Sequence, residues 1–425
     1  MEGDQRMLWD LTTMGRWKKP QLDLWKPDIA EEIYIGNEVH VRVPATHTQQ
    51  MKENLFQQNI PFKIMIEDLQ ILIDRSSASH SKARAVSLET YDYTVYHPID
   101  EIYEWMEQIK DAHGNLVTHH ILGHTYEERP IFYFKIGFPS AKTKKAIFMD
   151  CGIHAREWIA IAYCQWFVKE ILNQYREDPL LTKMLKQVDF YVVPVLNADG
   201  YVYSWTDDRL WRKNRSPQDN GTCFGVDLNR NFDSQWGTIG TSHDCEVITY
   251  CGPSSASELE TKAVVRLVEQ LQPNVLMYLT IHSYGQLILL PYGYKYFPSV
   301  NHYEMTKLAE RAAEKLKEEH DSIYVVGSTA VILYYTSGSS ADWAADEDIR
   351  FSYTYELRDD GEYGFELPAE EIKPTCEEVF TSMLLIFDHI DEHYLGPLEG
   401  SAVAVTSASL TFLSFAVCIY FALMQ

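Results

Sequence analysis

Three segments of almost continuously apolar residues constrain the fold of this chain more than any other feature. They span Ala146–Ile153, Phe190–Leu196 and Val275–His282, and they alternate with longer stretches of helical character at Trp158–Tyr175 and Ser257–Gln270. A strand that is apolar at nearly every position must be covered on both faces, and helices provide that cover in such alternating chains. The sequence therefore predicts an α/β fold, a three-layer α/β/α sandwich around a mixed and mostly buried sheet.

The charge balance narrows the classes of function. The chain has 425 residues, with 37 Lys and Arg against 61 Asp and Glu, so its formal net charge is −24. Hydrophobic residues make up 46% of the chain, and this share excludes a mostly disordered protein. Nucleic-acid binding depends on Lys and Arg that neutralise phosphates, so this charge argues against a nucleic-acid partner.

A separate, small α+β unit is expected before the main domain, at residues 21–75. Its expected elements are strands at Val39–Val43 and Pro61–Ile66 and helices at Thr48–Asn59 and Glu67–Arg75.

The other boundaries follow from composition. Residues 1–20 are interpreted as an N-terminal extension, and residues 76–84 as a polar, basic linker with a tryptic-type cleavage site at Arg84. The main domain is expected at residues 85–396, and residues 397–425 form a tail of different character.

The tail is notable because Ser401–Gln425 contains no charged residue. Its strongly apolar part, Leu410–Met424, is shorter than the roughly 20 residues that span a bilayer. Small residues at positions 400–402 followed by an apolar end favour a GPI-attachment signal, with a spanning tail and a buried helix as the alternatives. We therefore expect attachment to a membrane through a lipid anchor at the extracellular face, or secretion. Residues 1–19 lack the apolar core of a signal peptide, so we expect the true start to lie upstream.

The spacing His-x-x-Glu, which can supply two ligands to one zinc ion, occurs four times. The histidines are His124, His154, His243 and His389. Three of them lie in polar segments, where a solvated surface is the simpler interpretation. His154 differs because it directly follows the apolar strand at Ala146–Ile153.

A second histidine, His282, ends another apolar strand in the same way. Ligands of α/β proteins bind beyond the carboxyl ends of the strands, where His154, Glu157 and His282 would project. Two histidines and one glutamate leave a fourth position for water, as catalytic zinc requires. The sequence predicts one zinc ion at this place.

Further polar residues would complete such a site. Glu356 lies on the alternating strand Phe351–Asp359, where a carboxylate beside a water could accept its proton. Arginines bind carboxylates in a planar, bidentate manner, and a cluster of them in the loops points to an anionic substrate. The clustered arginines are Arg156, Arg212, Arg215 and Arg230.

At these residues the sequence resembles the A/B subfamily of zinc metallocarboxypeptidases. The resemblance runs from about residue 21 to 395. The matching segments are HAREW (154–158), WRKNR (211–215), GVDLNRNFD (225–233), IHSYGQ (281–286), LYYTSGSSADW (333–343) and YELRD (355–359).

The resemblance implies a role for each matching residue. His154, Glu157 and His282 would bind zinc. Glu356 would activate the water and Arg212 would stabilise the oxyanion. The residues that would contact the substrate are Arg156, Asn229, Arg230, Tyr334 and Ala341, and Asp227 would orient His154. The expected activity is removal of single residues from the C-termini of peptides or proteins, by an enzyme that acts as a monomer.

The same resemblance implies the disulfides Cys223–Cys245 and Cys151–Cys164, with Cys251 and Cys376 as free thiols. It also relates residues 21–75 to the later part of the family's activation peptide.

Ala341 would occupy the specificity position. An aspartate there would favour basic C-terminal residues and an arginine acidic ones. With alanine there, and with Thr329, Thr336 and Ser339 lining the pocket, we expect neutral residues to be preferred, and acidic ones if another basic group reaches the pocket.

Two alternatives remain at the level of sequence. One is a non-catalytic peptide-binding or scaffold protein that kept the fold, although no ligand or base is missing. The other is an inactive precursor held by residues 21–75, although the shortened length of this unit argues against tight inhibition.

Overall fold

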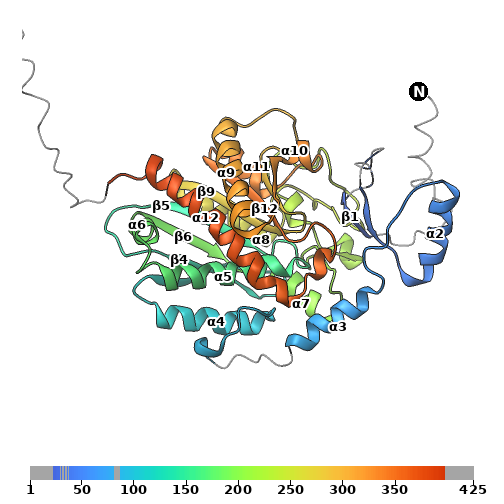
Figure 1. The fold of residues 1–425 in the computed structure, drawn as a ribbon, viewed down its shortest axis with the longest axis horizontal. Helices are drawn as coiled ribbons and strands as arrows, with labels where there is room; N and C mark the ends of the chain where they lie inside the picture. Colours follow the sequence, from blue (N-terminus) through green and yellow to red (C-terminus); the bar gives the residue numbers. More distant parts are fainter. Residues whose placement is uncertain are drawn as a thin grey trace, which may run out of the picture.

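The computed structural model describes residues 23–28, 30, 33, 36, 38–80 and 87–397. Its main feature is an eight-stranded sheet with the order β11-β10-β12-β9-β5-β6-β4-β3 (Figure 1). The strands are β3 (Val117–His124), β4 (Pro130–Ile136), β5 (Lys145–Cys151), β6 (Val188–Val193), β9 (Val275–Ser283), β10 (Leu287–Leu290), β11 (Val325–Ser328) and β12 (Phe351–Leu357). The central strands β6, β5, β9 and β12 are parallel, whereas β3, β4 and β10 make antiparallel pairs, so the sheet is mixed as predicted.

Helices cover both faces of this sheet. The larger core contains residues of α4 (Ile99–Ala112), α5 (Trp158–Gln174), α6 (Pro179–Gln187), α7 (Ala198–Thr206), α9 (His302–His320) and α12 (Ile372–Tyr394). The second core contains residues of α8 (Leu259–Leu271) and α11 (Ser340–Asp346). Along β5, Ile147 and Met149 belong to the first core, and Ala146 and Phe148 to the second. Successive side chains of a strand point to opposite faces, which explains why the apolar run is continuous. The predicted three-layer sandwich is confirmed.

The small N-terminal unit agrees only in part with the prediction. It contains β1 (Asp23–Lys26) paired antiparallel with β2 (His40–Arg42), followed by α2 (Thr48–Gln57) and α3 (Leu69–His80). The strand predicted at 61–66 is wrong. Its residues are exposed or half-buried and pair with no strand, and Pro61 cannot donate a ladder hydrogen bond.

The predicted linker is also shorter than expected, because α3 continues to His80. Residues 81–86, including Arg84, lie outside the described residues, as do residues 1–22 and 398–425 with the charge-free tail. Within the part of the chain that the structure describes, no helix has the length and apolar character needed to cross a membrane.

Both expected disulfides are present. Cys151–Cys164 joins the end of β5 to α5, and Cys223–Cys245 closes a surface loop. Cys251 and Cys376 are buried free thiols. The small N-terminal unit and the C-terminal end of α12 lie on opposite sides of the sheet, at the blue and red ends of the ribbon in Figure 1.

Candidate active site

Three buried side chains meet at the carboxyl ends of two neighbouring parallel strands. The Nδ1 atom of His154 lies 2.7 Å from Oε1 of Glu157, and Nδ1 of His282 lies 3.0 Å from its Oε2. The two Nδ1 atoms are 3.2 Å apart. Within the described residues, this is the one group of three or more His, Cys, Asp or Glu side chains close enough to hold a metal ion.

The sheet brings these residues together. β5 and β9 are parallel neighbours, with Cys151 beside Ile281, so the chain reaches His154 and His282 at the same edge. Glu157 precedes the first residue of α5. The structure therefore brings His154, Glu157 and His282 together at the ends of β5 and β9, as predicted.

The remaining ring nitrogens are held by other side chains. Nε2 of His154 lies 3.2 Å from Oδ1 of Asp227, and Nε2 of His282 lies 3.0 Å from the hydroxyl of Thr280. Burial alone would raise the pKa of Asp227, but Arg212 and Arg230 hold this pKa well below its usual range. The ionised Asp227 accepts a hydrogen bond from Nε2–H of His154, which leaves Nδ1 free to bind a metal.

This donor set fits zinc. Two imidazole nitrogens and one carboxylate, with no fourth protein ligand among the described residues, are the ligands of a catalytic zinc site with an open position.

Glu356 lies beside this cluster. It pairs in register with His282 across β12 and β9 and is partly exposed. Desolvation by the surrounding protein raises the pKa of its carboxyl, while His282 opposes this shift.

A buried carboxylate of the N-terminal unit, that of Asp28, forms hydrogen bonds with two of the predicted arginines, Arg212 and Arg230. Oδ2 of Asp28 accepts hydrogen bonds from Nη2 of Arg230 at 2.7 Å and from Nη2 of Arg212 at 3.1 Å. The hydroxyl of Tyr334 donates to the same oxygen at 3.0 Å. Burial and the neighbouring Asp28 raise the pKa of Tyr334, so its hydroxyl stays protonated and can donate.

Hydrogen bonds to other groups of the same domain orient the side chains of Arg212 and Arg230. Nε of Arg212 donates to Asp227 at 3.0 Å, and Nε of Arg230 donates to the carbonyl of Gly240 at 2.9 Å. Gly338, with a φ of 76°, packs so closely that a Cβ would lie 2.2 Å from the carbonyl oxygen of Arg230. Only glycine allows so close an approach at position 338, and this contact places the segment just before α11 against the backbone of Arg230.

The other predicted substrate residues lie around this centre. Arg156 donates to Asp23 at 3.2 Å and stacks on Phe365, with its guanidinium 3.9 Å from the ring centroid. Asn229 accepts from the backbone of Ser340 at 2.9 Å, next to the buried Ala341 in α11.

One sequence-based expectation, on Arg215, is wrong. Arg215 is not part of the cluster, because its guanidinium stacks on Tyr203 and Trp211. The hydroxyl of Ser339 accepts from the backbone of Asp342 at the start of α11, and its place in the lining of the pocket stays a prediction.

Two other His-x-x-Glu histidines have partners outside this cluster. His243 is exposed, as expected, whereas the side chain of His389 is only 13% exposed and does not lie on a solvated surface. His243 contacts the carbonyl of Gly237, and His389 contacts Glu304.

Sequence reasoning missed two acidic residues at this site, Asp23 and Asp28. Both lie in a short segment around Trp25, whose ring packs against Tyr284 and Phe365. Nothing in the spacing of these residues marks them, because their partners lie more than 130 positions away.

Comparison with known proteins agrees with this geometry. Residues 102–382 match the zinc carboxypeptidase family, and residues 9–76 match the carboxypeptidase activation peptide. The chain is 57% identical to carboxypeptidase O of Bos taurus over 307 residues, which is 72% of this chain and 82% of the relative. It is 53% identical to carboxypeptidase O of Homo sapiens over 343 residues, or 79% of this chain and 91% of the relative.

Solved structures give the same result. The crystal structure of thrombin activatable fibrinolysis inhibitor is 36% identical with a TM-score of 0.85, covering 92% of this chain and 96% of that one. The carboxypeptidase A from Helicoverpa armigera is 25% identical with a TM-score of 0.80, covering 93% and 96%. This chain therefore belongs to the zinc carboxypeptidase family, whose members bind one zinc ion per chain and hydrolyse C-terminal peptide bonds.

Proposed function

We propose that His154, Glu157 and His282 hold the zinc ion and that Glu356 is the general base for hydrolysis of the C-terminal peptide bond. When bound, the metal polarises the scissile carbonyl and makes its water a stronger acid. Glu356 accepts the proton of the attacking water and passes it to the leaving amine. Its position beside His282 in the sheet supports this role.

The observation that carries the substrate assignment is the carboxylate of Asp28. Three donors, from Arg230, Arg212 and Tyr334, converge on one of its oxygens in a buried setting. A place that binds one carboxylate by charge-assisted hydrogen bonds can bind another. We assign Asn229 and Arg230 to the terminal carboxylate of the substrate, with Tyr334 closing over it and Arg156 on its path. Arg212 stabilises the oxyanion that develops at the scissile carbonyl.

The contacts of Asp28 also support the second alternative named above, in which the chain is an inactive precursor held by residues 21–75. Its carboxylate occupies the donors that a substrate needs, and Asp23 occupies Arg156. Residues 21–75 thus act as an inhibitory unit, 85–396 as the catalytic domain, and cleavage in the segment 76–84 releases the inhibition.

The preference for a C-terminal residue follows from Ala341, which brings no charge. The neighbouring Asp342 accepts from the backbone of Gly293 at 2.9 Å, and burial raises the pKa of its carboxyl to about 7. Thr336 has a buried hydroxyl without a partner among the described residues. Neutral C-terminal residues, including polar ones, fit this environment best, and acidic residues stay an outcome of the test. The enzyme acts as a monomer, attached to the extracellular face of a membrane by a lipid anchor in place of the tail 397–425.

The test uses the purified protein after limited trypsin treatment, loaded with zinc, on peptides that differ only in a C-terminal Phe, Gln, Glu or Lys. The proposal requires release of one residue, loss of the activity with a chelator, and faster release of Phe and Gln than of Lys. A clear preference for Lys would contradict the assignment of Ala341.

A further inference from the structure

Four large apolar side chains lie exposed within eight residues, in the loop after β10 and at the start of α9. Tyr296, Phe297, Val300 and Tyr303 expose 68%, 75%, 97% and 77% of their surface. Folded proteins rarely leave such a cluster in water unless a partner or a lipid surface covers it. We refer to residues 296–303 as the aromatic loop.

The aromatic loop lies at the end of the sheet opposite the active site. β10 runs antiparallel to β12, with Leu287 beside Glu356 and Leu289 beside Thr354. The chain therefore leaves β10, after Leu290, at the end of the sheet away from Glu356. Glu304, next to Tyr303, binds Arg350, and Arg350 directly precedes the start of β12 at Phe351, so Tyr303 lies near the end of β12 away from Glu356.

The described chain also ends next to this loop. In the last turns of α12, His389 lies 3.0 Å from the carboxylate of Glu304, and the hydroxyl of Tyr394 donates to the same carboxylate. Glu304 directly follows Tyr303 in α9. The structure is described to residue 397, and residues 398–425 follow, of which 401–425 carry no charge. The described part of the chain thus ends beside the aromatic loop.

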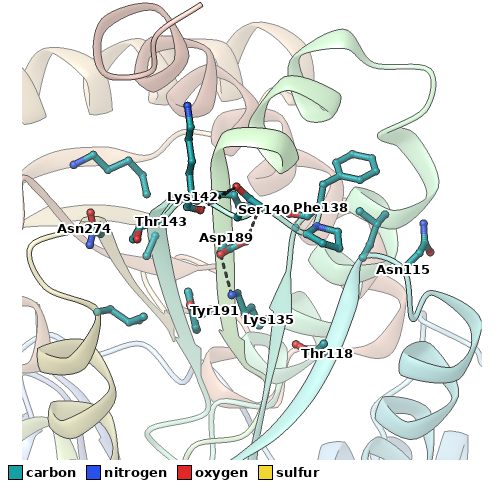
Figure 2. A pocket seen from close by; sticks show the side chains of 18 of the residues that line it. Asn115, Thr118, Lys135, Phe138, Ser140, Lys142, Thr143, Asp189, Tyr191 and Asn274 are labelled. Carbon is teal, nitrogen blue, oxygen red and sulfur yellow. Dashed lines mark hydrogen bonds and ion pairs between the residues drawn. The ribbon is translucent and has the colours of Figure 1, made fainter. Parts of the chain in front are cut away.

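A lysine-lined cavity of about 550 Å³ lies at the same end of the sheet (Figure 2). Its lining includes the starts of β5 and β6 and the loop after β4, and it contains Lys135, Lys142, Lys144 and Lys145. Asp189 is the one acidic residue in this lining, and it already binds Lys135 at 3.1 Å and Lys144 at 2.6 Å. In a chain with a net charge of −24, this local excess of positive charge complements phosphate groups.

We propose that this end of the molecule is a docking surface for a phospholipid bilayer. The aromatic loop enters the interfacial layer, where tyrosine and phenylalanine place an apolar body in lipid and, for tyrosine, a polar tip in water. The exposed side chains of Lys135 and Lys142 at the cavity face the lipid phosphates, whereas Lys144 is buried against Asp189. The inference extends the membrane attachment proposed above, and it turns the catalytic cleft away from the bilayer, toward the solution that carries peptide C-termini.

The test compares binding to phosphatidylcholine vesicles, measured by co-sedimentation, for a chain that ends at Pro397 and for the full chain. Every residue of the two cores lies between Tyr91 and Ile390, so the shorter chain keeps its complete core. The variant F297S/V300S removes one aromatic and one aliphatic side chain from the loop. The matched control I121S/Y126S removes the same classes from a different surface, where each residue is 53% exposed. Thermal midpoints check that all variants fold.

We expect the chain ending at Pro397 to bind the vesicles, F297S/V300S to weaken this binding by about tenfold or more, and I121S/Y126S to leave it unchanged. No binding by the shorter chain, equal losses in both variants, or binding that salt removes but F297S/V300S leaves intact would overturn the proposal. So would a dimer in the absence of vesicles that F297S/V300S dissociates, because a second copy would then cover the loop. A separate measurement tests the anchor. If the full chain, expressed in cells, is not retained on the membrane, the proposed lipid anchor is contradicted, and the vesicle result for the shorter chain is unaffected.

Discussion

Oδ2 of Asp28 lies 2.7 Å from Nη2 of Arg230, in a contact that joins the N-terminal unit to the proposed carboxylate-binding residues of the catalytic domain. Arg212 and Tyr334 reach the same oxygen. We propose that a substrate carboxylate cannot reach these donors while Asp28 stays in place, so that cleavage or displacement of the N-terminal unit is a condition for activity.

Replacing Asp28 by asparagine should activate the uncleaved chain. The substitution D28N removes the negative charge that Arg230 and Arg212 share, and hydrogen bonds to charged groups contribute about 1.5–3 kcal/mol each. We expect the activity of uncleaved D28N to exceed that of the uncleaved wild type by at least about tenfold, measured as the initial rate on a peptide ending in Phe. D23N, which affects the longer contact with Arg156 and the hydrogen bond from Trp25 but none of the contacts of Asp28, serves as the control and should give a smaller increase. Equal rates of uncleaved D28N and wild type would contradict the inhibitory role, provided that the two are equal after trypsin.

Replacing Glu356 by glutamine should separate metal binding from turnover. Glu356 is not among the three grouped ligand residues, so E356Q should keep a full complement of zinc, measured by elemental analysis. Loss of a general base costs about 10²–10⁴-fold in kcat. An E356Q enzyme with normal zinc and a near-normal kcat would exclude Glu356 as the base, and loss of zinc would place it among the ligands.

A charge introduced at Ala341 should set the preference for the last residue. Ala341 is buried at the start of α11, so a charged side chain there would act with little screening by water. We expect A341D to favour peptides ending in Lys and A341R to favour those ending in Glu, each by about tenfold or more in kcat/KM over Phe. The change A112D, at the exposed end of α4 outside the pocket, should leave the preference unchanged. The same preference in A341D and A341R would show that another residue determines specificity.

Stability should fall in mild alkali because of a buried carboxyl far from the active site. Burial raises the pKa of Glu260 from 4.5 to about 8, and one of its oxygens has no hydrogen-bond partner among the described residues. The folded state keeps a proton that the unfolded chain releases above pH 4.5, so stability decreases as the pH rises through about 8. The expected loss between pH 7 and 9 is about 1 kcal/mol.

E260Q should flatten this dependence, measured as the thermal midpoint at several pH values, whereas the exposed E314Q should not. An unchanged slope in E260Q would contradict the assignment of the proton to Glu260.

The amino-acid sequence is most informative where burial and chemistry coincide. Continuous apolar runs mark β5 and β9, so the positions of His154 and His282 at their ends can be predicted from the order of residues alone. The strand expected at 61–66 failed for the opposite reason, because its apolar residues face no core and periodicity alone cannot reveal this.

Contacts between distant segments could not be predicted in this way. Asp28 is one acidic residue among 61 Asp and Glu, and it becomes informative only when the fold brings it to Arg230, 202 positions away. Arg215 shows the converse, since it follows Arg212 by three positions but turns to an aromatic surface instead.

The most direct measurement uses two peptides of identical sequence, one with a free C-terminal carboxylate and one with a C-terminal amide. Each is incubated with the trypsin-treated, zinc-loaded enzyme, with and without a chelator, and the products are identified by mass spectrometry. The account predicts loss of one residue from the free acid, a much slower reaction of the amide, and no reaction with the chelator. Internal cleavage, or equal cleavage of both peptides, would contradict the central role of the carboxylate-binding residues Asn229 and Arg230.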